Sequence, residues 1–482
     1  MEEKVSVYFR NQLRWTMKSN CQEAGHAVYS STRLVGQLDA QRDLSPASIE
    51  NNKEWQRCTF TSNDLANLKS KFYTAHLLAM GMVDEDTKKE WNCPKEIAHV
   101  CRYSLKLESY HTQNIMILDG KEYPCRLTDV SVWFFPCELV LLSIEIVDSG
   151  VDLNSLTKMH RQWKNWYINY KKFRTGNLDE ILKPLAELTK NDVGNNKTSS
   201  SKNVINEHEI LIDRISNITY KHTKMRQFQV IQIEEKELRN DLLYELGTHS
   251  DIGTVNNPDL SMSFKPSDDY FRSIVQENMV SAFSNWKALA LNDTFSVLAI
   301  CDFVSFEGDY RYFEMIYMRC LVQEYYCFNR NNSYREETES NGSKNSNDLA
   351  KVEKEIDLME KYYFYDDMGY DFLPPLMYQA IVKGLGLVGD KKELTDHVKQ
   401  ALREENRQKK ETQIEMENLS RNKIEETMRL VSILTVLSAA WSLQEMMIAL
   451  CPCLFGNMVF KLLMLLLAFA LIIYIRNKIK RK

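Results

Sequence analysis

Apolar residues are distributed unevenly along this chain, and the two longest apolar runs lie at its C-terminal end. The first runs for 21 residues from Leu430 to Leu450, with Glu445 as its only ionisable group. The second runs for 18 residues from Met458 to Ile475. An α-helix needs roughly 20 residues to cross the hydrocarbon of a bilayer, so the pattern predicts two transmembrane helices. Their predicted boundaries are 428–450 for the first helix, 451–457 for a short outer loop and 458–475 for the second helix.

The segment before the first apolar run predicts a long solvated helix. Lys391 to Thr427 contains no Gly or Pro and is rich in Glu, Lys, Gln and Arg, which is helix composition. Within 403–418 only Ile414 and Met416 are apolar, so most of this stretch must face water. Together with the first apolar run it predicts one helix of roughly 60 residues, a stalk of about 90 Å at 1.5 Å per residue.

Upstream of the stalk the pattern predicts an α/β body. Polar stretches at 190–203 and 329–348 are typical of linkers. Two β-rich runs between Tyr123 and Asp148 meet at Pro136–Cys137, which predicts a hairpin. Apolar periodicity predicts helices at 153–173, 270–289 and 310–329. The predicted fold class is an α+β membrane protein with a cytosolic α/β domain (1–300), a helical region with the stalk (301–427) and a C-terminal transmembrane hairpin.

Charge adds an orientation to this picture. From Met428 to Lys482 there are seven basic residues and one acid, whereas the other 427 residues carry 54 basic and 65 acidic groups, a net charge of -11. Basic residues before the first apolar run and in the tail 476–482 predict that both termini are cytoplasmic, in a multi-pass protein of the bacterial inner membrane. The alternative is a pair of buried core helices. An acidic body argues against direct nucleic-acid binding.

Motifs that would indicate an enzyme are not found. Gly384-Leu-Gly-Leu-Val-Gly389 matches the letters of a dinucleotide fingerprint, but it follows a predicted helix where the fingerprint needs a strand. It is better explained as a helix C-terminus and turn. The sequence has no recognisable zinc spacing, nucleophile elbow or P-loop, so we expect no enzymatic activity.

One helix mixes aromatic and basic side chains, the combination that stacks a base and neutralises a phosphate. The candidate ligand-binding residues are Trp163, Trp166, Lys171, Lys172 and Arg174. The alternative is an aromatic core stripe with a solvated basic face.

Three carboxylates lie close together in the sequence before Pro374-Pro375. Asp366, Asp367 and Asp371 are ligand types suited to a hard cation such as Mg²⁺. The alternative is a solvated turn.

The first apolar run has a polar stripe at helical spacing, which predicts a pore lining once several chains surround an axis. The stripe consists of Val431, Thr435, Ser438, Ser442 and Glu445. Small hydroxyls could instead hold helices together. For Glu445 a ring of carboxylates around a cation pore is one interpretation, and a structural ion pair with Lys461 is the other.

The stretches RNKIEETMRLVSILTVLSAAWSL and DFLPPLMYQAIVKGLGL, with the Tyr-rich helix 310–329, resemble the CorA superfamily of divalent-cation channels. The likeness covers residues 301–482, and before that only the architecture is similar. That family ends its first span in Gly-Met-Asn, whereas this chain has Cys-Leu-Phe-Gly456-Asn457-Met458 in the outer loop.

Lacking that motif, the chain is most similar to the CorA-like effectors associated with type III CRISPR systems. The resemblance implies a homopentameric channel for antiviral defence, gated by a nucleotide second messenger of the S-adenosylmethionine–AMP type and compromising the membrane of infected cells. Its partners would be the lipid bilayer, other copies of the chain and the messenger. A divergent Mg²⁺/Co²⁺ transporter and a membrane-tethered scaffold without a pore are the alternative functions.

Overall fold

The computed structural model describes most of the chain from residue 27 to residue 450. The described ranges are 27–38, 45–58, 62–107, 113–118, 121–148, 151–164, 225–234, 238–259, 265–300, 307–339 and 346–450, with separate positions between 462 and 473. The chain divides into two compact units, Met1–Val398 (unit 1) and Lys399–Lys482 (unit 2).

Unit 1 is built on one mixed sheet, which has ten strands in the described residues. The strands follow the spatial order β2-β3-β5-β6-β1-β7-β10-β9-β8, and β4 pairs with β5. Their bounds are β1 Ala27–Leu38, β2 Trp55–Arg57, β3 Cys101–Leu105, β4 Gln113–Leu118, β5 Lys121–Phe134, β6 Val140–Asp148, β7 Arg226–Ile233, β8 Met279–Val280, β9 Trp286–Ala290 and β10 Thr294–Ala299.

The centre of the sheet is the long strand β1, which pairs antiparallel with β6 on one side and with β7 on the other. β10 runs parallel to β7, and the other pairs are antiparallel. The predicted hairpin at Pro136–Cys137 is confirmed, because β5 and β6 pair along their length. Cys137 and Glu138 make the turn with positive φ of 61° each.

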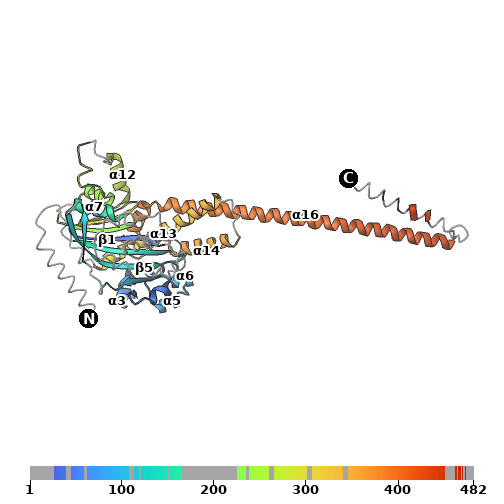
Figure 1. The fold of residues 1–482 in the computed structure, drawn as a ribbon, viewed down its shortest axis with the longest axis horizontal. Helices are drawn as coiled ribbons and strands as arrows, with labels where there is room; N and C mark the ends of the chain where they lie inside the picture. The colour runs from blue at the N-terminus through green and yellow to red at the C-terminus, as the bar shows by residue number, and fades with distance from the viewer. Residues whose placement is uncertain are drawn as a thin grey trace, which may run out of the picture. The chain divides into compact units, whose positions relative to one another are not determined.

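Helices cover both faces of the sheet (Figure 1). Successive strand residues point to opposite faces, so neighbours on β1 identify the two layers. Thr32 contacts His160 of α7 and the next residue, Arg33, contacts Glu314 of α13. Helices of unit 1 are α2 Pro46–Glu50, α3 Ser62–Lys71, α4 Thr74–Ala79, α5 Glu85–Glu90, α6 Lys95–Ala98, α7 Leu153–Lys164, α11 Asn240–Thr248, α12 Asp268–Asn278, α13 Glu307–Glu339, α14 Ser346–Tyr362 and α15 Leu373–Gly384.

The α7 and α11 side of the sheet holds a large apolar core. Strand residues such as Leu34 and Ile144 are fully buried there, together with Met159 and Trp163 of α7 and Leu246 of α11. The opposite side is different, because it buries arginines and carboxylates beneath α13. Unit 1 therefore has one apolar inner layer and one inner layer with buried charges.

The predicted long helix is confirmed as α16, Leu387–Leu450, which is continuous over 64 residues. It follows α15 through a turn in which Gly386 has a φ of 73°, so Gly384 to Gly386 are the helix end and turn that the context predicted, whereas Gly389 already belongs to α16. In its charged part the helix satisfies many of its own charges one turn apart, which stabilises a helix that is polar all round. These pairs are Arg407 with Glu404 and Glu411, Arg421 with Glu417, and Arg429 with Glu425.

The predicted transmembrane hairpin is wrong. Among the described residues, no helix is both long enough and apolar enough to cross a membrane. Polar side chains interrupt the apolar run in the last six turns of α16. These are Ser432, Thr435, Ser438, Ser442, Gln444 and Glu445. Of the expected second helix, 458–475, only separate positions belong to the described residues, and the loop 451–457 and tail 476–482 lie outside them.

Two smaller predictions also need correction. The helix expected over 270–289 ends at Asn278, because the chain then pairs as β8 and β9 at the edge of the sheet. The linker expected over 329–348 is partly helical, since α13 continues to Glu339. Arg330 and Arg335 within that extension pair with Glu355 of α14 and Glu393 of α16. Tertiary pairing thus overrides the local composition in both places.

Candidate functional site

The aromatic–basic helix predicted as a ligand site is described only at its beginning. Trp163 is fully buried in the apolar core, with its ring 5.2 Å from that of His160, and Lys164 forms an ion pair with Asp293. The core-packing alternative therefore accounts for Trp163. The other candidates, Trp166, Lys171, Lys172 and Arg174, lie outside the described residues.

The three aspartates proposed for Mg²⁺ are not brought together. Asp366, Asp367 and Asp371 are exposed in the segment between α14 and α15, whereas Met368 and Gly369 between them are buried. No group of three or more His, Cys, Asp or Glu side chains in the described ranges is placed to hold a metal ion. The arrangement matches the solvated turn.

Three side chains of the polar stripe on α16 have hydrogen-bond partners within their own helix. Thr435 Oγ1 donates to the carbonyl of Val431 at 2.7 Å, and Ser442 Oγ donates to that of Ser438 at 3.1 Å. The indole of Trp441, one turn earlier, donates to Glu445 at 3.2 Å. Glu445 thus has a partner on α16 itself, while Lys461, Gly456 and Asn457 lie outside the described residues.

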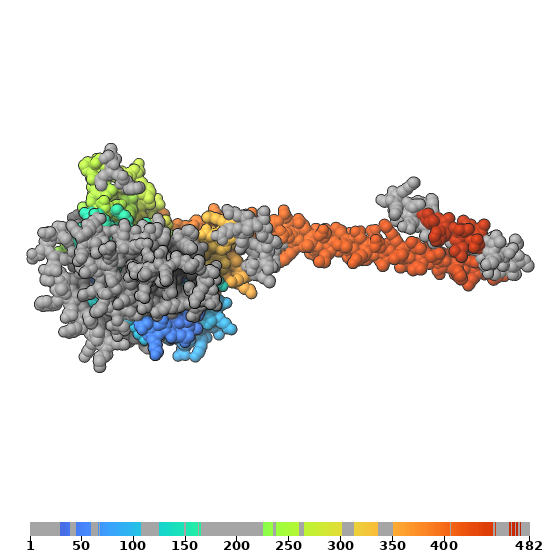
Figure 2. All heavy atoms as spheres, in the orientation of Figure 1, coloured from blue at the N-terminus to red at the C-terminus, as the bar shows by residue number. Residues whose placement is uncertain are grey.

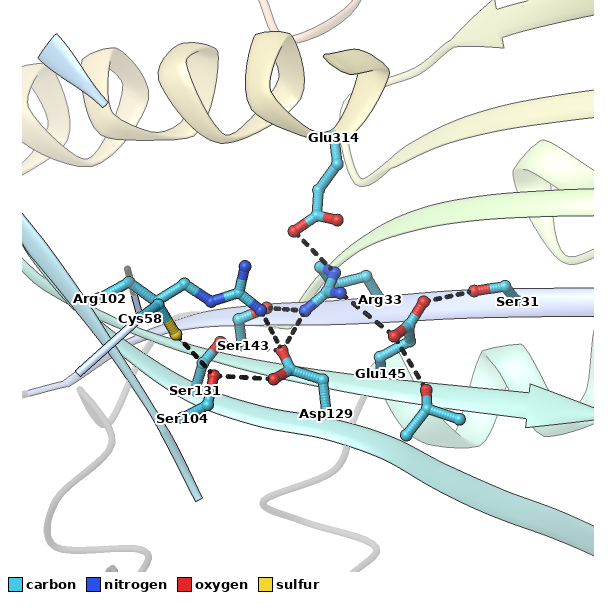
Figure 3. Close-up of polar contacts among 11 residues, drawn as sticks. Ser31, Arg33, Cys58, Arg102, Ser104, Asp129, Ser131, Ser143, Glu145 and Glu314 are labelled. Atoms are coloured by element: carbon cyan, nitrogen blue, oxygen red, sulfur yellow. Dashed lines mark hydrogen bonds and ion pairs between the residues drawn. The ribbon is translucent and has the colours of Figure 1, made fainter. Parts of the chain in front are cut away.

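The structure shows a charged site that the sequence did not indicate, on the α13 side of the sheet (Figure 3). Arg33 of β1 is 4% exposed and contacts three carboxylates from three different elements. The distances are 2.6 Å to Asp129 of β5, 3.3 Å to Glu145 of β6 and 2.9 Å to Glu314 of α13. A second cation, Arg102 of β3, lies 2.7 Å from Asp129. These five residues are the Arg33 cluster.

Small polar side chains complete the hydrogen bonds of the Arg33 cluster. Ser104 and Ser131 donate to Asp129 at 3.1 and 3.0 Å, and Ser31 donates to Glu145 at 3.0 Å. Pairing between β5 and β6 shifts register between Leu127 and Asp129, which inserts Thr128 as an extra residue. Thr128 also donates to Glu145, at 2.8 Å. Such irregularities often re-aim side chains at functional sites, and this one directs two successive β5 side chains to Glu145 and Arg33.

The pKa values of Asp129 and Glu314 in the Arg33 cluster are shifted in opposite directions. Burial by itself would raise the pKa of Asp129, but Arg102 and Arg33 outweigh it and hold that pKa well below its usual range. Burial raises the pKa of Glu314 despite the two arginines, and Glu145 and Asp129 add to the effect by repulsion. Asp129 is therefore held as an anion and is a poor base, whereas Glu314 is a weaker acid than an ordinary glutamate.

A second charged group lies farther along α13. Arg226 of β7 pairs with Asp293, in the turn between β9 and β10, and with Glu324 of α13. Lys164 of α7 pairs with the same Asp293. We call these four residues the Arg226 cluster; Asp390 of α16 acts on the pKa of Glu324 by repulsion. Burial raises the pKa of Glu324 to about 7, against the opposing effect of Arg226.

On the other face of the sheet, buried polar groups remain without partners. Asp148 is 2% exposed and neither carboxyl oxygen has a hydrogen-bond partner; burial raises its pKa to about 8. His160 accepts or donates one bond with Thr32 at 2.8 Å, and burial lowers its pKa to about 3. Both side chains are therefore neutral near pH 7.

Sequence reasoning missed both charged clusters because their members are far apart in the chain. The available signal was a charge inside a β-rich segment, as with Glu145 in the mostly apolar run LLSIEIVD and Arg33 beside the apolar pair Leu34–Val35. Such a residue needs a partner on its own face. Only strand order and register show which residues those partners are.

The site thus consists of buried ion pairs, and the two glutamates that α13 contributes have raised pKa values. Comparison of the chain with family models, with curated proteins and with solved structures finds no match.

Proposed function

We propose that this chain is a self-assembling effector in which unit 1 senses a ligand and α16 delivers the response by associating with other copies of the chain. The observation that carries the proposal is the apolar surface on the last part of α16. Residues 428–446 of this helix are called its apolar segment.

Large side chains of the apolar segment are uncovered on every side of the helix. Their exposed fractions lie between 36% and 67%. In Figure 2 this stretch, orange to red, shows its side chains on the visible face. The residues are Met428, Leu430, Val431, Leu434, Val436, Leu437, Trp441, Leu443 and Met446.

Apolar surface of this extent marks an interaction site, because leaving it in water costs about 25 cal/mol for every Å². A covering partner therefore gains a large hydrophobic free energy. The spacing of the polar stripe favours other copies of the same helix as that partner. Ile424, Met428, Val431, Thr435 and Ser438 follow each other at intervals of four and three residues, which is the spacing of a coiled-coil seam, and the first three are apolar.

Hydrogen bonding in the stripe is compatible with burial in such a seam. Thr435 and Ser442 already donate to carbonyls of their own helix, so covering these two hydroxyls by a second helix leaves neither of them unpaired. Glu445 keeps the Trp441 indole as a partner. Parallel association of identical helices would place the Glu445 side chains at one level.

Unit 1 supplies the sensing half of the proposal. A mixed sheet followed by α13, α14, α15 and the 64-residue α16 is the order of elements expected from the resemblance to CorA-like effectors, and it supports a protein of that type. The ligand would then be a nucleotide second messenger and the role antiviral defence. The transmembrane hairpin forms no part of the proposal.

The test is the mass of the full-length protein in solution, measured by light scattering after size exclusion. Joint replacement of Ile424, Met428 and Val431 by Asp should reduce an oligomer to monomers, because three charges would have to be buried in the seam between the helices. Replacing Ile414 and Met416 by Asp is the matched control, since both are exposed apolar residues of the charged part of α16. The control should stay oligomeric. A monomeric wild type, or an oligomer that survives the triple substitution, contradicts the proposal.

A further inference from the structure

Uncovered aromatic rings gather where the turn between β8 and β9 meets the segment between α14 and α15. Tyr370 and Phe372 are 66% exposed each, and Phe283 is 42% exposed. The ring of Phe283 lies 6.3 Å from that of Phe372, and the ring of Tyr370 lies 4.6 Å from that of Tyr73 in an edge-on contact. Leu376, one turn into α15, is 39% exposed. Uncovered apolar side chains that lie together in this way mark an interaction site.

The backbone that carries these rings is held in place by the segment between α3 and α4. The amide of Tyr73 donates to the carbonyl of Met368 at 2.9 Å, and the amide of Tyr370 donates to the carbonyl of Lys71 at 3.0 Å. A Cβ on Gly369 would lie 2.2 Å from the oxygen of Lys71, so the two segments are in close contact there. The side chain of Met368 is fully buried. The rings are therefore exposed on a backbone that is already ordered.

Both ends of this segment are also fixed. Arg319 of α13 donates to the carbonyls of Tyr363 and Tyr365 at 2.8 and 3.0 Å, and its guanidinium lies 4.0 Å from the centre of the Tyr365 ring. After Phe372 the chain enters α15 at Leu373, which is buried. A partner that binds here has little backbone entropy to remove, which favours binding.

Exposed carboxylates alternate with the exposed rings. Asp366, Asp367 and Asp371 are all exposed, and Asp371 stands between Tyr370 and Phe372 in the sequence. Partial burial and then the charge of Asp367 raise the pKa of the Tyr73 phenol, so this carboxylate lies beside the pair of tyrosine rings. Within the part of the chain that the structure describes, no basic side chain forms an ion pair with any of the three aspartates.

This combination of rings and carboxylates restricts the chemistry of a partner. An apolar surface would remove water from the carboxylates without replacing the lost hydrogen bonds, which is costly. A guanidinium group satisfies both features, because it stacks on an aromatic face and donates two hydrogen bonds to a carboxylate. An ammonium group supplies the charge but not the planar stacking. The surface therefore fits arginine side chains better than lysine side chains.

We propose that this surface docks an arginine-rich segment of a partner protein. We call it the aromatic–acidic patch, and it consists of Phe283, Asp366, Asp367, Tyr370, Asp371, Phe372 and Leu376. Arginines of the partner stack on the exposed rings and pair with the neighbouring aspartates. The patch belongs wholly to unit 1, so the proposal does not rest on assembly through α16.

The first test measures binding of labelled hexa-arginine and hexa-lysine peptides to the full-length protein by fluorescence anisotropy. The wild type should bind hexa-arginine more tightly than hexa-lysine. Joint replacement of Tyr370 and Phe372 by Ser should weaken hexa-arginine binding by about tenfold and remove the preference for arginine, because the stacking surface is lost. Joint replacement of Trp91 and Tyr270 by Ser is the control, since both are exposed aromatic residues outside the patch. The control should keep the preference.

The second test separates the patch from general attraction to an acidic protein. Changing Asp366, Asp367 and Asp371 together to Asn should weaken binding of both peptides. The matched control removes three exposed carboxylates of α14 by Glu353→Gln, Asp357→Asn and Glu360→Gln. It changes the net charge by the same amount and should leave both affinities within about twofold of wild type.

Equal wild-type affinities for the two peptides, or equal losses in the patch and control variants, overturn the proposal. Circular dichroism shows whether each variant is folded. Should the Tyr370 and Phe372 variant fail to fold, Phe283→Ser removes the ring in the neighbouring turn. An arginine preference that is unchanged in Phe283→Ser then overturns the proposal.

Discussion

Two aspartates of unit 1 show how strongly the surroundings of a carboxyl group determine its pKa. Asp129 and Asp148 are carboxyl groups on neighbouring strands, yet their pKa values move in opposite directions. Two arginines contact Asp129, whereas no donor reaches Asp148, which lies opposite Ser30 and Cys125 in the strand register. No sequence pattern distinguishes these two aspartates. The difference comes from which face of the sheet each side chain lies on.

Asp148 gives a prediction at this scale. Its pKa is raised by burial to about 8, so the folded state binds a proton that the unfolded state has released above its ordinary pKa near 3.8. The stabilisation is fully present below that ordinary value and is lost as the pH rises through 8, at about 1.4 kcal/mol for each pH unit. Asp148→Asn should remove this decline, gaining on the order of 3 kcal/mol over wild type between pH 5 and pH 8.

Urea unfolding at several pH values measures the effect of Asp148→Asn. Asp366→Asn, at an exposed carboxyl, is the control and should follow the wild-type profile. If wild type and Asp148→Asn lose stability in parallel as the pH rises, the carboxyl is not the buried proton carrier inferred from its contacts.

At the scale of elements, the sequence predicted the helices that depend on local composition and missed the strands that depend on pairing with distant segments. The length of α16 followed from composition alone, because no Gly or Pro interrupts it between Lys391 and Thr427. β9 was mistaken for the end of a helix. The five residues Trp286–Ala290 carry no clear strand pattern, and they form a strand because they pair with β10. The α15–α16 turn was predicted correctly from its glycines. Their individual roles needed the structure.

Substituting alanine for Gly384 and for Gly389 should change the stability of the protein in opposite directions. A Cβ on Gly384 would lie 2.6 Å from the backbone oxygen of Ala290, so Gly384→Ala must push the end of α15 away from β9. We expect a loss of about 1–3 kcal/mol in the free energy of unfolding. A Cβ on Gly389 meets nothing within 4 Å, and this residue lies in α16. Gly389→Ala should therefore stabilise the protein by roughly 0.5–1 kcal/mol.

Chemical denaturation of both alanine variants, run side by side, checks the pair. Equal effects of the two substitutions would mean that α15 does not approach β9 as closely as the structure has it.

At the scale of the whole molecule, the sequence predicted an acidic α/β body followed by a long helix, and the structure places the unit boundary inside that helix, after Val398. Composition could not locate this boundary, because α16 is helical on both sides of it. Burial does locate it. Leu387, Leu394 and Val398 are between 2% and 6% exposed, whereas the apolar side chains from Ile414 to Met446 are largely uncovered. The charged candidate sites depend on the same long-range packing, which is why no local motif revealed them.

This boundary leads to the final prediction, which concerns truncation. A chain that ends at Leu402 keeps the buried start of α16 and should unfold as cooperatively, and with nearly the same midpoint in urea, as unit 1 does in the full-length protein. A chain that ends at Gly386 loses Leu387, Leu394 and Val398, each of which contributes about 1.5–3 kcal/mol by burial. It also loses the Asp390 and Glu393 contacts of α13. The shorter chain should therefore be less stable by several kcal/mol, which is a large part of the 5–15 kcal/mol typical of a folded domain. Urea unfolding followed by circular dichroism compares the two chains, and equal midpoints would show that the first turns of α16 do not belong to unit 1.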